Sequence, residues 1–274
     1  MSDYGNEYSP SDTEPQAKRA IHPLERSAPP PPPPIAPPEP QMPRRRVQMR
    51  THTPALTYAL LVVNIFIFLA DALLNGQLTQ LGAKDNAALL AGEYWRLVTP
   101  MFLHGGILHI GFNSYFLYII GPQVERAFGS FRFAALYFLS GISGVIFSFA
   151  FNRAPSIGAS GALFGLIGAL IPFLYRNRAL LVDTRRRILS ILQVIGINLL
   201  IGLAPGIDNW GHLGGLLAGL GLAWVTTPLY QVRPGAEDTI IVEDKSTPAV
   251  SWLAFLGGSV VLLGLFQFAM ILRR

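Results

Sequence analysis

The sequence contains no cysteine and few charged residues. Without cysteine, the chain has no disulfide bonds, no thiolate metal ligands and no cysteine nucleophile. Only 14% of the 274 residues are charged and 51% are hydrophobic, whereas about a quarter of the residues of a soluble domain are charged. No nucleic-acid-binding motif, phosphate-binding loop or internal repeat stands out. This composition predicts a polytopic, all-α membrane protein that binds no nucleic acid.

Residues 1–50 differ in composition from the rest of the chain. They mix charges of both signs and include six consecutive prolines, Pro29 to Pro34. Such a segment buries too little apolar surface to fold, so we expect a disordered, solvated Pro-rich tail with extended polyproline conformation. Binding of a proline-recognising partner is the alternative. The tail has no early apolar stretch, so we do not expect a cleavable signal peptide.

Seven apolar stretches follow the tail, and each approaches the length that a helix needs to cross a bilayer. Several are short or rich in glycine, which is typical of helices packed closely in a bundle. They cover approximately residues 55–74, 107–124, 133–151, 157–175, 188–203, 211–227 and 250–272.

Arginines predict the orientation of these spans. Arg44, Arg45, Arg46 and Arg50 precede the first span, and five arginines between positions 176 and 187 follow the fourth. Positively charged connections remain in the cytoplasm, and with seven spans both groups lie on the same side. We therefore expect a cytoplasmic N-terminus and an outer C-terminus, with the terminal arginine pair as a minor exception.

Polar residues on three spans are predicted to lie at the same shallow depth below the outer surface. Ser160, in Gly158-Ala159-Ser160-Gly161, lies roughly 5 Å inside the fourth span. His212 lies near the start of the sixth span. His109 and Asn113 lie near the start of the second span, and their spacing of four places them on one helix face. Polar residues inside a membrane are costly and usually functional.

These residue types suit amide hydrolysis. Ser160 would be the nucleophile and His212 its base, while His109, Asn113 and the Ser160 backbone N–H could stabilise the oxyanion. Asp208 lies one turn before His212 but in a connection, so we do not expect it to be an essential acid. Gly215 and Gly219 leave one face of the sixth span bare, which allows a close approach to Ser160.

These motifs resemble those of the rhomboid intramembrane serine proteases over about residues 51–228. The matches are Gly158 to Gly161, the sequence Gly-His-Leu-Gly-Gly around His212, and His109-Ile-Gly-Phe-Asn113 as the oxyanion element. His104 fits the histidine before that element, and Trp95-Arg96 resembles a pair in the first outer loop. The resemblance implies a six-helix catalytic bundle over residues 51–228, with residues 229–274 as a linker and a seventh transmembrane helix.

Two positions depart from the family pattern. Family members often have a Glu-x-Arg pair after the second span, whereas Glu125 is followed by Arg126 and Ala127. Phe164 stands where some members have a tyrosine packed on the catalytic histidine. It can stack equally well but offers no hydroxyl group.

The remaining site residues have structural roles in this interpretation. Trp95 is expected to anchor the first outer loop at the membrane interface, with Arg96 on lipid phosphate or loop carbonyls. His104 is expected to make a loop-structuring hydrogen bond. No third ligand accompanies His104 and His109, so we expect neither a metal nor another cofactor.

The leading functional hypothesis is an endopeptidase that cleaves membrane proteins near the outer face. The resemblance implies single-span transmembrane substrates, and a plasma (inner) membrane location in a bacterium. The alternative is an inactive rhomboid-like protein that binds or escorts membrane proteins, although retention of Ser160 and His212 argues against it. A transporter is disfavoured because the polar cluster is shallow and repeat symmetry is absent. The oligomeric state is left open.

Overall fold

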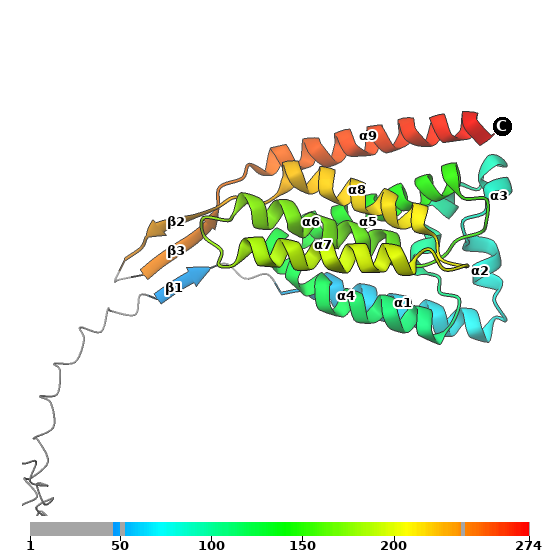
Figure 1. Cartoon of the computed structure of the whole chain (residues 1–274), viewed down its shortest axis with the longest axis horizontal. Coiled ribbons are helices and arrows are strands. Elements are labelled where there is room, and N and C mark those ends of the chain that lie inside the picture. Colours follow the sequence, from blue (N-terminus) through cyan, green and yellow to red (C-terminus); the bar gives the residue numbers. More distant parts are fainter. Residues whose placement is uncertain (1–45, 50–52, 237–238, 274) are drawn as a thin grey trace, which may run out of the picture. The chain divides into compact units, whose positions relative to one another are not determined.

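The computed structural model describes residues 46–49, 53–236 and 239–273, without the side chains of residues 46–49. The predicted disorder of the tail up to residue 45 lies outside these ranges. The described part of the chain is mostly helical, with one small sheet at one end of the helices (Figure 1).

Seven long helices correspond to the seven apolar stretches. By length and composition, three of the described helices, α1, α5 and α9, are apolar and long enough to cross a membrane, and α6 is a shorter apolar helix. The bounds are α1 Ala55–Leu73, α4 Ile107–Phe128, α5 Ser130–Phe151, α6 Ser160–Arg176, α7 Thr184–Ile201, α8 Asn209–Thr226 and α9 Pro248–Arg273.

Helix α6 lies at the centre of the bundle. Every residue from Ala162 to Leu170 is buried, because α4, α5, α7 and α8 all pack against this helix. A helix buried on every side must be apolar all round, which explains the uninterrupted apolar run in the sequence.

Helices α6 and α8 approach each other through glycines. A Cβ atom added to Gly215 would lie 1.9 Å from the carbonyl oxygen of Gly161, and one added to Gly219 would lie 2.1 Å from that of Gly165. No side chain fits between backbones this close. The glycines therefore determine how near α8 comes to α6.

The connection between α1 and α4 is folded rather than irregular. It contains helices α2 (Gln77–Gly82) and α3 (Asn86–Leu90) and the 3₁₀ turns η2 (Tyr94–Leu97) and η3 (Thr99–Phe102). These short elements lie at the end of the bundle where α6 and α8 begin (Figure 1).

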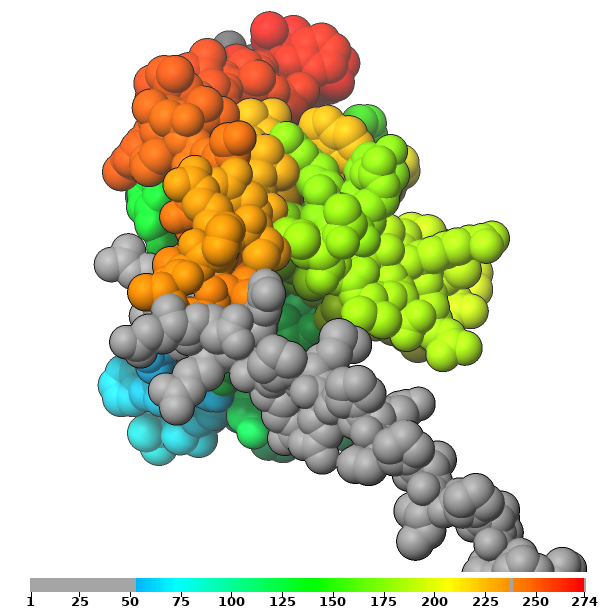
Figure 2. Space-filling model, turned by 90° about the vertical axis from the view of Figure 1, so that its left-hand side faces the viewer, coloured from blue at the N-terminus to red at the C-terminus, as the bar shows by residue number. Residues whose placement is uncertain are grey.

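A three-stranded sheet occupies the opposite end of the bundle. Strands β2 (Tyr230–Pro234) and β3 (Thr239–Asp244) form an antiparallel hairpin, and β1 (Arg46–Met49) pairs in parallel with β3, in the order β1-β3-β2. In the view toward this end, the orange surface of the linker lies beside the yellow-green connection between α6 and α7 (Figure 2). The sheet was not predicted, and β1 consists of residues that the sequence assigns to the tail.

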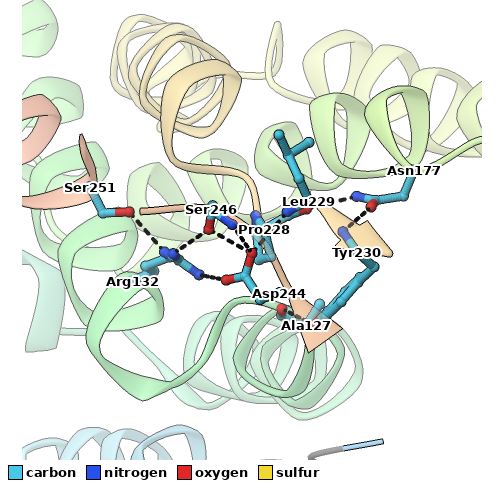
Figure 3. Close-up of polar contacts among 9 residues, drawn as sticks. All are labelled: Ala127, Arg132, Asn177, Pro228, Leu229, Tyr230, Asp244, Ser246 and Ser251. Atoms are coloured by element: carbon cyan, nitrogen blue, oxygen red, sulfur yellow. Dashed lines mark hydrogen bonds and ion pairs between the residues drawn. The ribbon is translucent and has the colours of Figure 1, made fainter. Parts of the chain in front are cut away.

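Side chains attach the hairpin to the helices (Figure 3). Arg132 of α5 donates to Asp244 at 2.7 Å, to Ser246 at 2.7 Å and to Ser251 of α9 at 2.9 Å. The Tyr230 hydroxyl donates to the carbonyl oxygen of Ala127 at 2.7 Å. One arginine thus holds the end of β3 and the beginning of α9 on α5.

Candidate active site

Ser160 is the first residue of α6, and the segment before it depends on Gly158. The backbone of Gly158 has φ of 124°, a conformation that favours glycine. A Cβ atom there would also lie 2.7 Å from Nε2 of His109. The Gly158 N–H donates to the carbonyl oxygen of Pro100 at 2.8 Å. Gly158 therefore brings the start of α6 against both α4 and the first connection.

His212 lies within hydrogen-bond distance of Ser160. Its Nε2 is 2.9 Å from the Ser160 Oγ, although the two residues are on different helices. The His212 side chain is buried, and the Phe164 ring stacks on it with centroids 4.4 Å apart and an angle of 10° between the planes. Phe164 holds the imidazole in the plane that faces Ser160.

No carboxylate contacts the other ring nitrogen of His212. Its Nδ1 has no hydrogen-bond partner among the described residues. Asp208 instead accepts the Gly211 N–H at 3.2 Å and the Asn152 side-chain amide at 3.2 Å, both through Oδ1. Asp208 thus caps the N-terminus of α8, and no described carboxylate lies within bonding distance of the His212 ring.

His109 and Asn113 face the same cavity as the Ser–His pair. All four residues line an open cavity of about 1130 Å³. The Asn113 amide nitrogen donates to the His109 carbonyl oxygen at 2.9 Å, and His109 Nδ1 accepts the Gly105 N–H at 3.3 Å. Because Nδ1 is an acceptor, the neutral His109 ring carries its proton on Nε2, the nitrogen beside Gly158.

His104 lies behind His109, with the ring centroids 5.1 Å apart in an edge-on arrangement. The side chain is only 3% exposed, and burial lowers the pKa of His104 to about 4, helped by the neighbouring His109. Neither ring nitrogen has a hydrogen-bond partner in the described ranges. The Phe102 backbone opposes this pKa shift, and the loop-structuring role of His104 stays a prediction.

Comparison with known proteins now decides the family. The Rhomboid domain family model matches residues 91–229, which is just over half of the chain. The chain belongs to the rhomboid family. It is an integral membrane protein with multiple membrane-spanning helices.

Relatives in bacteria and plants share the same region. The chain is 42% identical over 172 residues to rhomboid protease GluP of Bacillus subtilis, an alignment that covers 61% of this chain and 34% of the relative. It is 41% identical over 166 residues to the mitochondrial RHOMBOID-like protein 6 of Arabidopsis thaliana, which covers 60% of this chain and 53% of that protein. The chain thus spans a third to a half of the length of these rhomboid relatives.

Arg96 organises the first connection of this rhomboid protein. It is 6% exposed and its Nη1 donates to the carbonyl oxygens of Ala83 at 2.7 Å and Gln80 at 3.1 Å. Its Nε pairs with Glu93 at 2.7 Å. Of the two partners considered from the sequence, the structure therefore shows loop carbonyls. The Trp95 ring is half exposed, and its N–H donates to the carbonyl oxygen of Leu81 at 3.0 Å.

Glu125 has partners that the family motif does not suggest. Its carboxylate accepts the backbone N–H groups of Leu56 at 3.1 Å and Thr57 at 2.7 Å, and the hydroxyl groups of Thr57 and Ser130, each at 2.7 Å. Glu125 therefore caps the start of α1 and joins α1, α4 and α5 far from the cavity.

Within the described ranges, no group of three or more His, Asp or Glu side chains comes together. Sequence reasoning missed one residue near the site, Lys84, which is completely buried beside the segment leading to Ser160. A single lysine in a connection adds nothing to a periodic pattern, so only its burial distinguishes it.

Proposed function

We propose that this rhomboid is an intramembrane serine endopeptidase that uses Ser160 and His212 as a catalytic dyad. The observation that carries the proposal is the 2.9 Å contact between Ser160 Oγ and His212 Nε2. A serine hydroxyl is a weak nucleophile unless a base accepts its proton. This contact joins two helices inside an apolar bundle, where an unused polar pair would be costly.

The proposed reaction has two halves. Ser160 Oγ attacks the scissile carbonyl carbon while His212 Nε2 accepts the hydroxyl proton, and the tetrahedral oxyanion then collapses to an acyl-enzyme. His212 returns the proton to the leaving amine. A water molecule, deprotonated by His212, attacks the ester and restores Ser160. Because His212 Nδ1 lacks a carboxylate partner, packing by Phe164 orients the ring in this scheme.

The oxyanion would be stabilised from two helices. The Ser160 N–H lies at the N-terminus of α6, where backbone donors point out of the helix. His109 Nε2 and the Asn113 amide come from α4 and line the same cavity. In the structure Asn113 donates to its own helix, so its side chain would rotate toward the oxyanion when substrate is bound.

In the proposed topology, α1 and α4 to α8 form the six-helix catalytic bundle of residues 51–228. Residues 229–274 then form the linker and a seventh transmembrane helix, and residues 1–50 a cytoplasmic Pro-rich tail. The exposed arginines of the α6–α7 connection support a cytoplasmic location for the sheet end. Ser160 would then face the outer side, in the plasma membrane if the source is bacterial.

The cavity suggests the class of substrate. Its lining includes Phe112 and Phe116 of α4 and Asn198 and Ile201 of α7. A transmembrane segment entering between α4 and α7 would reach Ser160 after local unwinding, because a helical amide is shielded by its own hydrogen bonds. We therefore propose single-span membrane proteins as substrates.

The test is cleavage of a single-span reporter protein by the full chain in liposomes. Ser160→Ala and His212→Ala should each abolish cleavage, and the double variant should be no worse, because groups that act as a unit lose function together. Ser190→Ala, an exposed serine of α7, is the matched control. Binding of the reporter without any cleavage by the unaltered protein would favour the inactive, escorting alternative.

A further inference from the structure

Lys84 is a buried cation at the end of α5. Its side chain has no exposed surface, and its Nζ donates to the carbonyl oxygens of Ala154 at 2.7 Å, Asn152 at 3.0 Å and Ser148 at 3.5 Å. The last carbonyl groups of a helix lack partners within the helix and carry partial negative charge. Lys84 therefore caps the end of α5 and also binds Asn152 and Ala154 beyond it.

Burial and neighbouring charges have opposing effects on the pKa of Lys84. Burial lowers the pKa of Lys84 to about 8, while the carboxylates of Asp208 and Asp85 raise it and Arg273 of α9 lowers it. Arg273 reaches the same helix end, where its Nε donates to the carbonyl oxygen of Phe149 at 2.8 Å.

The backbone of Lys84 holds the segment that leads to Ser160. Its N–H donates to the Ser156 carbonyl oxygen at 2.9 Å, and the Ser156 N–H donates back at 3.1 Å. The segment 152–156 is thus bound by both the side chain and the backbone of one residue. Gly158 follows two residues later, and Ser160 follows four residues later.

Asn152 extends the same support to His212. Its carbonyl oxygen accepts from Lys84 while its side-chain amide donates to Asp208. Asp208 accepts the Gly211 N–H with its carboxylate and the His212 N–H, at 3.1 Å, with its backbone carbonyl. A continuous chain of hydrogen bonds therefore runs from Lys84 to the first turn of α8.

We propose that Lys84 is a positioning residue for the Ser160–His212 pair. It fixes segment 152–156, which leads to Ser160, on one side and, through Asn152 and Asp208, the N-terminus of α8 on the other. This proposal rests on the proposed protease function. It does not require Lys84 to touch substrate, and it gives one buried side chain control over the relative position of nucleophile and base.

The first experiment compares Lys84→Met with Lys84→Arg, using Lys245→Met as the control because Lys245 is exposed. Turnover is expressed per Ser160 site titrated with a fluorophosphonate, so that unfolded protein is not counted. Lys84→Met should lower kcat about 100-fold with little change in KM, since a misplacement near 1 Å has about that effect. Lys84→Arg should restore part of the loss, and Lys245→Met should match the unaltered protein.

The second experiment measures amide hydrogen exchange and needs no cleavage. Lys84→Met should speed exchange both in residues 152–158 and in residues 209–212. Asp208→Ala should speed it only in residues 209–212, and Asp208→Asn, which can still cap the helix, should change it little. Hydrogen exchange can be measured even if the unaltered protein cleaves no substrate. A failure of the proposed protease function is therefore distinguished from a failure of the positioning role.

Two results would overturn the positioning role. One is an unchanged kcat per titrated site in Lys84→Met, which would reduce Lys84 to a stabilising residue. The other is exchange that increases evenly over the bundle, or in only one of the two segments. If the Lys84→Met variant is too unstable to purify, Lys84→Arg and the two Asp208 variants are measured instead, and the same criteria for kcat and hydrogen exchange apply to them.

Discussion

Substitution of Gly215 by alanine should separate the two helices that carry the proposed dyad. A Cβ atom at this position would lie 1.9 Å from the Gly161 carbonyl oxygen, whereas ordinary contacts begin at 3.4 Å. The obstacle is backbone one residue after Ser160, which cannot rotate away as a side chain could. Relieving the clash therefore requires α6 and α8 to move apart by about 1.5 Å if neither helix deforms.

Such a movement is large compared with the contact that it would disturb. The Ser160–His212 distance is 2.9 Å, and a further 1 to 1.5 Å would take the pair out of hydrogen-bond range. We expect kcat to fall about 100-fold or more, because a misplacement near 1 Å has that effect. Overpacking would also destabilise the fold by about 1–3 kcal/mol. Gly215→Val should be more severe, since its branched side chain needs still more space.

The assay is cleavage of a single-span reporter in liposomes, with kcat expressed per Ser160 site titrated with a fluorophosphonate. Gly221→Ala is the control, because it adds the same methyl group to the same helix at a position with no atom within 4 Å. A normal kcat in Gly215→Ala would refute the reasoning. An equal loss in Gly221→Ala would show that an added methyl group impairs α8 without any such contact, and the contact with Gly161 would then explain nothing.

Three further predictions concern the cavity and the first connection. Asn113→Ala should lower kcat by roughly 10²–10³-fold. The loss should be smaller than in Ser160→Ala, because His109 and the Ser160 N–H remain as oxyanion donors. An unchanged rate would show that Asn113 does not belong to the oxyanion site. Cysteines introduced at the facing ends of α4 and α7 can form a single disulfide, because the chain has no other cysteine. This disulfide should slow cleavage of transmembrane substrates relative to the reduced protein. Equal rates at complete cross-linking would mean that substrate enters by another route. The pKa of His104 is about 4 in the folded state against 6.5 in the unfolded chain. Between these pH values, the imidazole is protonated only in the unfolded chain. The free energy of unfolding should therefore fall by up to about 3 kcal/mol as the pH drops from 6.5 toward 4. Thermal unfolding from pH 7 to 4.5 should therefore show a smaller decline in His104→Phe, and equal declines would contradict the assignment.

Long apolar helices could be predicted from the sequence because each is specified locally, by hydropathy and length. The same holds for the glycine spacing of α8, where Gly215 and Gly219 lie on the face that meets α6. Placement of Ser160 and His212 at one depth required only the order of the spans and their orientation.

Short elements could not be predicted, because a stretch of four to six residues carries too little periodicity. Strand β3, Thr239–Asp244, has three apolar residues in a row and then two acids, which could as well be a loop. Its strand conformation depends on pairing with β1 and β2 and on Arg132. Lys84 was missed for a related reason, since its significance lies in carbonyl groups more than 60 positions later in the chain.

The sheet has a consequence for how the protein is assembled in the membrane. Strand β1 pairs with β3 in the register Arg46 to Thr239, so the contact joins segments almost 200 residues apart. During synthesis, β1 emerges before the first bundle helix and β3 only after the last of the six. In the proposed topology, the sheet can therefore close only after all six bundle helices have been inserted.

Closure also requires that β1 and β3 end on the same side of the bilayer. In the proposed topology, six crossings would return the chain to the side where it began, whereas a chain that failed to insert one helix would leave the two strands separated by the membrane. Pairing of β1 with β3 would then be impossible, and the unpaired edge of β3 would be exposed to solvent or to quality-control proteases. The small sheet thus distinguishes a correctly threaded chain from one with a missing crossing, at a distance from the residues proposed to cut peptide bonds.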